Sequence, residues 1–192
     1  MKLRAPMFAA LIVATLAIPA FAAHYKVDPV HSALMFRVKH MNTSYAYGRF
    51  NAISGTFAID SADPAKSSFN FLIKADSVDT GNAGRDKHLT GPDFFNAKQF
   101  PMIGFKTKTI AAARSGTDSY EVTGDLTLHG VTKPITVVVV MTGTGKDMTG
   151  KAIAGIETRF TIKRSDFGMK GMMAAVGDEV QIALASEGVL SK

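Results

Sequence analysis

The sequence of 192 residues contains no cysteine and no tryptophan. Without cysteine, the chain cannot form a disulfide, a thiolate nucleophile, or a zinc or iron–sulfur site with cysteine ligands. The net charge is also small, since 22 Lys and Arg against 16 Asp and Glu leave only +6. These positive charges form no cluster of the kind that neutralises nucleic-acid phosphates, so nucleic acid is not an expected partner.

The first 22 residues are predicted to be a signal peptide that is removed on export. Lys2 and Arg4 precede an apolar run at Met7–Ile18, and Ala20-Phe21-Ala22 matches the small-x-small rule for cleavage. The apolar run is shorter than the roughly 20 residues that a retained membrane anchor needs. No later run is long enough either. We therefore expect a secreted protein without a membrane span, located in the periplasm of a Gram-negative cell.

Alternation of apolar and polar residues with a period of two predicts β-strands along the mature chain, residues 23–192. In residues 34–39, Leu34, Phe36 and Val38 share one face and basic residues occupy the other. Alternating runs also occur at 53–60, 69–75, 102–109, 120–128, 154–162 and 180–184, with turn-like residues at 60–64, 114–119 and 142–150. Strands separated by short turns in one domain are typical of an all-β antiparallel sandwich or barrel.

Two segments depart from simple alternation. Ile135–Met141 is β-branched and apolar on both faces, which predicts a strand covered on both sides. Gly143 and Gly145 fall in a predicted hairpin-like turn, where a positive φ explains them better than a nucleotide-binding loop does.

Residues 82–95 show no alternation at all. We expect a short helix near Gly84–Thr90, which Gly91-Pro92 then ends, followed by a turn that carries Phe94 and Phe95. A helix crossing one mouth of a barrel would fit this break in the pattern.

Motifs for catalysis are missing. The sequence contains no Gly-x-Ser-x-Gly, no P-loop and no dinucleotide fingerprint. The five histidines lack the spacing of a zinc pair, although folding could bring His31, His40 and Asp86 together. We therefore predict no catalytic residues, no metal and no obligatory cofactor.

Two local pairs of charged residues leave alternatives open. Asp86 and His88 would suit an acid–base pair in a hydrolase, but short helices more often use such residues in ion pairs and caps. Arg164 and Asp166 could orient the head group of a ligand, or could pin a strand end to a turn.

The predicted inward faces are rich in phenylalanine, and composition alone does not separate a packed core from an apolar cavity that holds one small ligand. The residues expected to line such a cavity are Leu34, Phe36, Val38, Phe57, Phe69, Phe71, Ile73, Phe105, Leu126, Leu128, Ile156 and Phe160.

An ordered set of short motifs resembles the YceI family of secreted proteins, over essentially all of the mature chain. Two positions depart mildly: His129 lies at a loosely specified site, and Asn51-Ala52 replaces an often bulkier residue. The matching segments are 24–32 (HYKVDPVHS), 36–40 (FRVKH), 48–50 (GRF), 53–57 (ISGTF), 77–82 (SVDTGN), 85–89 (RDKHL), 93–96 (DFFN), 100–101 (FP), 124–134 (GDLTLHGVTKP) and 164–168 (RSDFG).

The resemblance implies a lipocalin-like, eight-stranded antiparallel barrel with a short helix at one mouth. It also implies an elongated apolar interior that binds a polyisoprenoid or another amphiphile, frequent homodimers, and no established catalytic reaction. The expected function is that of a periplasmic carrier for an isoprenoid-like lipid, either a polyprenyl chain or an isoprenoid quinone. Arg85, His88 and Arg164 are the candidates for binding its head group. The alternatives are a stress-response or redox-partner module that acts through its surface, or a hydrolase that uses Asp86 and His88.

Overall fold

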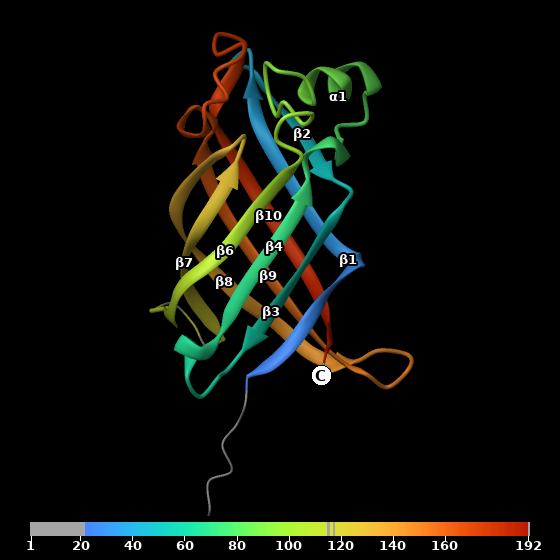
Figure 1. The fold of residues 1–192 in the computed structure, drawn as a ribbon, viewed down its shortest axis with the longest axis vertical. Coiled ribbons are helices and arrows are strands. Elements are labelled where there is room, and N and C mark those ends of the chain that lie inside the picture. Colours follow the sequence, from blue (N-terminus) through green and yellow to red (C-terminus); the bar gives the residue numbers. More distant parts are fainter. Residues whose placement is uncertain (1–21, 115, 117, 192) are drawn as a thin grey trace, which may run out of the picture.

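The computed structural model describes residues 22–114, 116 and 118–191, which form a closed antiparallel β-barrel (Figure 1). The predicted signal peptide, residues 1–22, lies outside the described residues except for Ala22. The strands are β1 (Ala23–His40), β2 (Ser44–Phe50), β3 (Ile53–Ile59), β4 (Ser68–Lys74), β5 (Val78–Asp79), β6 (Met102–Ala112), β7 (Ser119–Leu128), β8 (Val131–Lys146), β9 (Ala152–Lys163) and β10 (Val176–Leu190). The helix is α1 (Ala83–Leu89), and 3-10 turns lie at Pro64–Lys66, Ala75–Ser77 and Arg164–Phe167.

Eight strands close the barrel in the order β1–β3–β4–β6–β7–β8–β9–β10, and β10 pairs back onto β1. The first residues of β1, Ala23–Lys26, pair with β3, whereas its later part, Leu34–His40, pairs with β2. Strand β5 then extends the sheet beyond β2. Helix α1 lies at the upper end of the barrel in Figure 1, so the predicted eight-stranded barrel with a short helix at one mouth is confirmed.

Strand β1 is interrupted between Asp28 and Ala33, where its register with β10 shifts. Pro29 explains the break, because proline has no backbone N–H to donate to the β-ladder. The residues that bulge out there are exposed, and Val30 keeps 82% of its surface in solvent. The break allows β1 to leave β3 and join β2 while β10 runs beside both parts.

The prediction that Ile135–Met141 is covered on both faces is wrong. The segment lies within β8, where Val137 and Val139 are buried but Val138 is 40% exposed. A barrel strand has its partners beside it and the core on one side only, so its outer face stays open. β-Branched residues on that face favour the strand conformation itself.

Gly143 and Gly145 also lie in β8 and not in the predicted turn. A register shift between Met141 and Gly143 lets the strand continue to Lys146. The turn follows at residues 147–150, where a carboxylate oxygen of Asp147 accepts backbone hydrogen bonds from Thr149 and Lys151. Among the described residues, none of the helices has the length and apolar content to cross a membrane.

Candidate functional site

An apolar cavity of about 170 Å³ occupies the upper part of the barrel interior. All eight barrel strands contribute side chains to its wall, and Phe50 of β2 joins them. Among the described residues that line it, Thr158 and Arg164 are the polar ones. The Thr158 hydroxyl donates to the carbonyl oxygen of Val138 at 2.7 Å, so its hydrogen is already used. The wall therefore offers hydrocarbon contact and very little polar recognition.

The lower part of the barrel is filled by side chains. The rings of Tyr25 and Phe57 stack with centroids 5.1 Å apart, and Phe57 and Phe69 stack at 6.3 Å. Val122 is fully buried in the same hydrophobic core. This packing forms the floor of the cavity.

Eleven of the twelve predicted lining residues form part of the cavity wall, and Phe57 does not. Its ring covers Gly188 of β10, where an added Cβ would lie 2.6 Å from the ring. The alternating pattern correctly gave Phe57 an inward direction. Its depth in the barrel decided that it packs in the floor. The eleven in the wall are Leu34, Phe36, Val38, Phe69, Phe71, Ile73, Phe105, Leu126, Leu128, Ile156 and Phe160.

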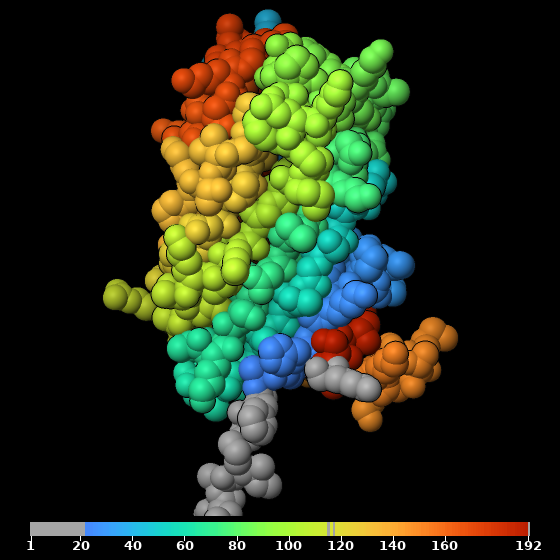
Figure 2. Space-filling model, in the orientation of Figure 1, coloured from blue at the N-terminus to red at the C-terminus, as the bar shows by residue number. Residues whose placement is uncertain are grey.

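Two segments that are distant in sequence cover the upper end of the cavity. The first contains α1 and the turn after it, and contributes Leu89, Phe94 and Phe95. The second is the loop between β9 and β10, which contributes Met169, together with Val176 at the start of β10. On the face drawn in Figure 2, the green α1 segment and the orange-red loop lie together above the strands.

Helix α1 is fixed at its start by its own polar residues. The Asn82 side chain accepts a hydrogen bond from the backbone N–H of Arg85 at 2.9 Å, which is an N-cap. Asp86 accepts from the backbone N–H of Thr80 at 2.9 Å. These contacts position the helix so that Leu89 and the following phenylalanines face the cavity.

Arg164 is the predicted head-group residue that reaches the cavity. It is only 3% exposed and donates four hydrogen bonds to backbone carbonyl oxygens, all between 2.7 and 2.9 Å. Burial lowers the pKa of this guanidinium, and nearby Asp178 partly offsets the effect. The carbonyl partners belong to Met169, Gly171, Val176 and Gly177. Arg164 therefore holds the loop that follows β9, and four of its five N–H groups are already used.

Arg85 and His88, the other two head-group candidates, do not line the cavity, and a role for them in binding a head group stays a prediction. The Arg85 guanidinium donates to the hydroxyl and to the carbonyl oxygen of Thr80, both at 2.7 Å. His88 Nε2 lies 2.9 Å from a carboxylate oxygen of Asp93. A seven-residue helix turns its faces in different directions, and these two side chains point to the outside while Leu89 faces inward.

The hydrolase alternative needs Asp86 and His88 to act together, and their contacts separate them. Asp86 is engaged by Thr80, and His88 is engaged by Asp93. Among the described contacts, no hydrogen bond joins the two side chains. The interpretation as local ion pairs and caps therefore describes this segment better than an acid–base pair does, with His88 paired to Asp93 and Asn82 as the cap.

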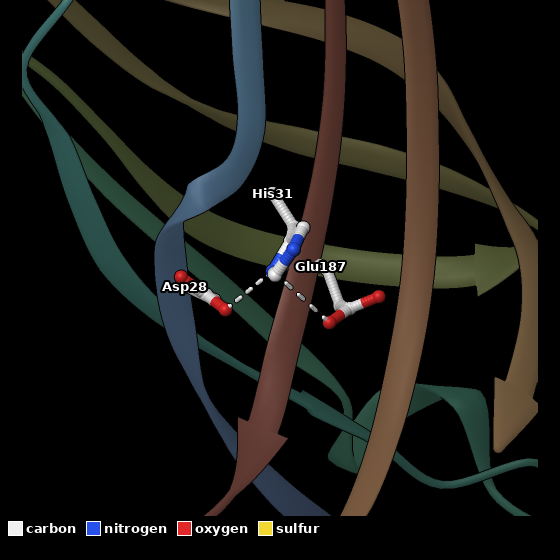
Figure 3. Close-up of side chains that lie close together, drawn as sticks. All are labelled: Asp28, His31 and Glu187. Carbon is white, nitrogen blue, oxygen red and sulfur yellow. Dashed lines mark hydrogen bonds and ion pairs between the residues drawn. The ribbon is translucent and has the colours of Figure 1, made fainter. Parts of the chain in front are cut away.

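One group of described side chains could jointly ligate a metal ion: Asp28, His31 and Glu187 (Figure 3). His31 Nδ1 lies 2.8 Å from Asp28 Oδ2 and 3.7 Å from Glu187 Oε1. The hydrogen bond to Asp28 raises the pKa of His31, and the same bond lowers the pKa of Asp28. The group thus acts as an ion-paired clasp between the bulge of β1 and strand β10. This group could not be predicted from the sequence, because Glu187 lies far along the chain from Asp28 and His31.

Other wall residues were also missed at the level of sequence. Those on β10 alternate plainly, and this alternation was a usable signal. Phe94 and Phe95 follow a helix, where no period of two exists to give their direction. The missed residues include Phe50, Ile53, Leu89, Phe94, Phe95, Ile103, Ile135, Val137, Val139, Met169, Val176, Val180, Ile182 and Leu184.

Comparison with known proteins decides the family. A model of the YceI-like domain matches residues 25–187, a range that reaches from the start of β1 into the last strand, β10. The chain belongs to the YceI-like family. Relatives of this YceI-like protein include UPF0312 proteins of Yersinia pestis (strain Pestoides F), 41% identical over 90% of both chains, and of Pseudomonas aeruginosa (strain LESB58), 40% identical over 88% of both.

Solved structures agree with the fold of this YceI-like protein. Burkholderia cenocepacia BcnA superposes with a TM-score of 0.75 at 28% identity, covering 84% of this chain and 98% of that one. The Campylobacter jejuni YCEI protein superposes with a TM-score of 0.69 at 30% identity, and the match covers 80% of this chain and 90% of that one. A polyisoprenoid binding domain from Saccharophagus degradans, implicated in plant cell wall breakdown, superposes with a TM-score of 0.66 at 17% identity, and the match covers 88% of this chain and 99% of that one. At this identity the likeness shows the fold alone.

Proposed function

We propose that this YceI-like protein binds one isoprenoid-like lipid, a polyprenyl chain or an isoprenoid quinone, and carries it as a non-enzymatic binding protein. The observation that carries the proposal is the apolar cavity, whose wall has two polar side chains, both already hydrogen-bonded. Each 100 Å² of apolar ligand surface removed from water contributes about 2.5 kcal/mol. Such a wall favours a branched hydrocarbon and offers almost no free hydrogen-bonding group to a polar substrate.

The size of the cavity adds a condition. Ligand sites commonly measure about 300–1,000 Å³, and a dry cavity of about 150 Å³ holds a single benzene ring. A cavity of about 170 Å³ is therefore smaller than a polyprenyl chain. We infer that a chain enters by displacing flexible wall side chains and the two covering segments. Phe36, Phe105 and Met169 are wall residues with rotatable side chains.

The head group is proposed to remain at the upper end of the cavity. Arg164 supplies the only charge in the described wall, and one of its N–H groups has no partner among the described hydrogen bonds. A quinone oxygen or a phosphate oxygen could accept from it.

Location in the periplasm and removal of residues 1–22 also remain proposals, which the mass of the mature protein in the exported soluble fraction would test. Homodimer formation is a prediction that light scattering after gel filtration can test.

The decisive experiment compares two tryptophan variants on adjacent residues of β10. Leu184 lines the cavity, whereas the next residue, Ala185, is exposed on the outer face. Leu184→Trp should fill the cavity and abolish saturable binding of a prenyl ligand, such as geranylgeraniol, while Ala185→Trp should bind as the original protein does. Protein purified from its own host should also carry an extractable lipid by mass spectrometry. Equal binding by both variants, or no binding by the original protein, would reject the proposal.

A further inference from the structure

Three exposed methionines gather at the upper end of the barrel. Met41, in the turn between β1 and β2, is 58% exposed, and Met172 and Met173, in the loop between β9 and β10, are 51% and 42% exposed. The backbone N–H of Met41 donates to the carbonyl oxygen of Ala175 at 2.7 Å, so the turn and the loop are tied together. We call these three residues the methionine tip.

The backbone holds two of these methionines in an unusual conformation. Met41 has φ of 48° and Met172 has φ of 50°. The left-handed region is unfavourable for most residues other than glycine and asparagine, which are the usual residues of such turns. The fold thus presents flexible apolar side chains to solvent at positions where small polar residues would fit better.

The two segments that carry the methionine tip contain basic residues and no acidic ones, although Asp93 of the neighbouring α1 segment packs against Gly171. Residues 39–45 and 168–177 contain no Asp or Glu, whereas Lys39 and Lys170 lie within them. Below the tip, on the outer face of β1 and β2, the Arg37 guanidinium carbon lies 4.5 Å from the centroid of the Tyr45 ring. Tyr47 beside them is 54% exposed. Apolar tips, tyrosines below them and flanking cations are the features by which proteins sit in a lipid interface.

The methionine tip is continuous with the cavity. Met169 and Val176, at the two ends of the loop that carries Met172 and Met173, both line the cavity wall. Arg164 donates to the carbonyl oxygens of both of these end residues. A surface that contacted the tip would therefore lie directly outside the covered end of the cavity.

We propose that the methionine tip docks the protein onto a phospholipid bilayer that carries anionic head groups, so that a lipid can pass between the bilayer and the cavity. The three methionines insert among the acyl chains, and Lys39, Lys170 and Arg37 contact the anionic head groups. The purpose of the docking rests on the proposed lipid-binding function. The docking itself rests on the exposed methionines and on the absence of acidic residues in the two segments that carry them.

Flotation with vesicles tests the docking. The full mature protein is mixed with vesicles of phosphatidylcholine alone, or with vesicles that contain 30% phosphatidylglycerol, and the bound fraction is measured. We expect binding to the anionic vesicles and a loss of at least about fivefold in the triple variant Met41→Asn, Met172→Asn, Met173→Gln. Asparagine tolerates a positive φ, so this variant should keep the fold. Lys39→Gln with Lys170→Gln should lower binding to the anionic vesicles alone.

Met148 provides a matched control at the opposite end of the barrel. It is fully exposed in the turn between β8 and β9, at the lower end in Figure 1. Met148→Gln should bind vesicles as the original protein does. If the original protein fails to float with anionic vesicles, or if the triple variant floats equally well, the tip is not a bilayer-docking surface. Failure of the original protein to float would also follow if the tip bound a protein partner, and that failure would overturn the bilayer proposal whatever its cause.

A separate titration with geranylgeraniol, without vesicles, distinguishes the two proposals. We expect the triple variant to bind the prenyl ligand normally, since its substitutions lie outside the cavity wall, but to take it up more slowly from loaded vesicles. Vesicle docking without prenyl binding would reject the carrier function and leave the docking surface in place. Prenyl binding without vesicle docking would reject the docking surface and leave the carrier function in place.

Discussion

The guanidinium carbon of Arg164 lies 5.8 Å from the centroid of the Phe94 ring. This contact joins the loop after β9 to the segment after α1, the two parts of the chain that cover the cavity. A cation over an aromatic face is favourable, and it is more so where both groups are shielded from water. The covered end of the barrel is therefore held by a side chain that also forms part of the cavity wall.

Replacing Arg164 by methionine should destabilise the protein strongly. The change removes four hydrogen bonds from a charged donor and leaves buried carbonyl oxygens without partners. We expect a loss of about 3 kcal/mol or more in the free energy of unfolding, measured by urea titration. Arg159→Met is the control, because Arg159 is exposed on the outer face of β9 and should change stability by less than about 0.5 kcal/mol. Equal effects of the two changes would contradict the structural role of Arg164.

Phe57 and Phe36 should respond differently to truncation, although both point inward. Phe57 is 1% exposed within the floor, so Phe57→Ala should cost about 3–5 kcal/mol in unfolding free energy. Phe36 already faces the cavity, and Phe36→Ala should cost less and enlarge the space for a ligand. Urea unfolding and geranylgeraniol titration measure the two effects. If Phe36→Ala lost more stability than Phe57→Ala, the assignment of Phe57 to the floor and of Phe36 to the cavity wall would be wrong.

His31 should make the stability of the barrel depend on pH. Its pKa is raised above the ordinary value of 6.5, chiefly by the hydrogen bond to Asp28. A raised pKa in the folded state stabilises the protein fully below pH 6.5, and this contribution is lost as the pH rises through the folded pKa. The stability difference between the original protein and His31→Gln should therefore shrink between pH 6 and pH 8.

NMR titration provides an independent check on the same clasp. Asp28→Asn should move the pKa of His31 down towards its ordinary value, and Glu187→Gln should move it less, since Glu187 is the more distant partner. A pKa of His31 that neither substitution changes would show that the clasp does not form in solution.

Removing the N-cap of α1 should loosen the cover of the cavity. Asn82→Ala deletes the acceptor for the Arg85 N–H, and such changes cost about 0.5–2 kcal/mol. We expect faster hydrogen exchange in residues 83–89 and faster release of a bound prenyl ligand. Asn82→Asp keeps an acceptor at this position and serves as the control. Unchanged release in Asn82→Ala would mean that α1 is not part of the route of entry.

Local patterns predicted much of this fold for a clear physical reason. A strand with one buried face must alternate, so residues 34–39 and 120–128 revealed both their conformation and their inward side. The same reasoning failed for the burial of Val138, because a β-branched residue also suits the exposed face of a strand. It failed for the turn expected at Gly143, because glycine occurs in strands as well as in turns. The helix was visible as a break in alternation that Gly91-Pro92 ended.

The sequence by itself determined most of the barrel strands, their inward faces, one short helix, and the lack of cysteine-based and motif-based chemistry. Tertiary structure alone decided which inward side chains meet a cavity and which fill the floor, since depth along a barrel depends on strand register and not on alternation. It also decided that Arg164 reaches the cavity while Arg85 and His88 do not. The clasp of Asp28, His31 and Glu187 and the methionine tip arise for the same reason: the closed sheet brings together residues that are distant in the chain.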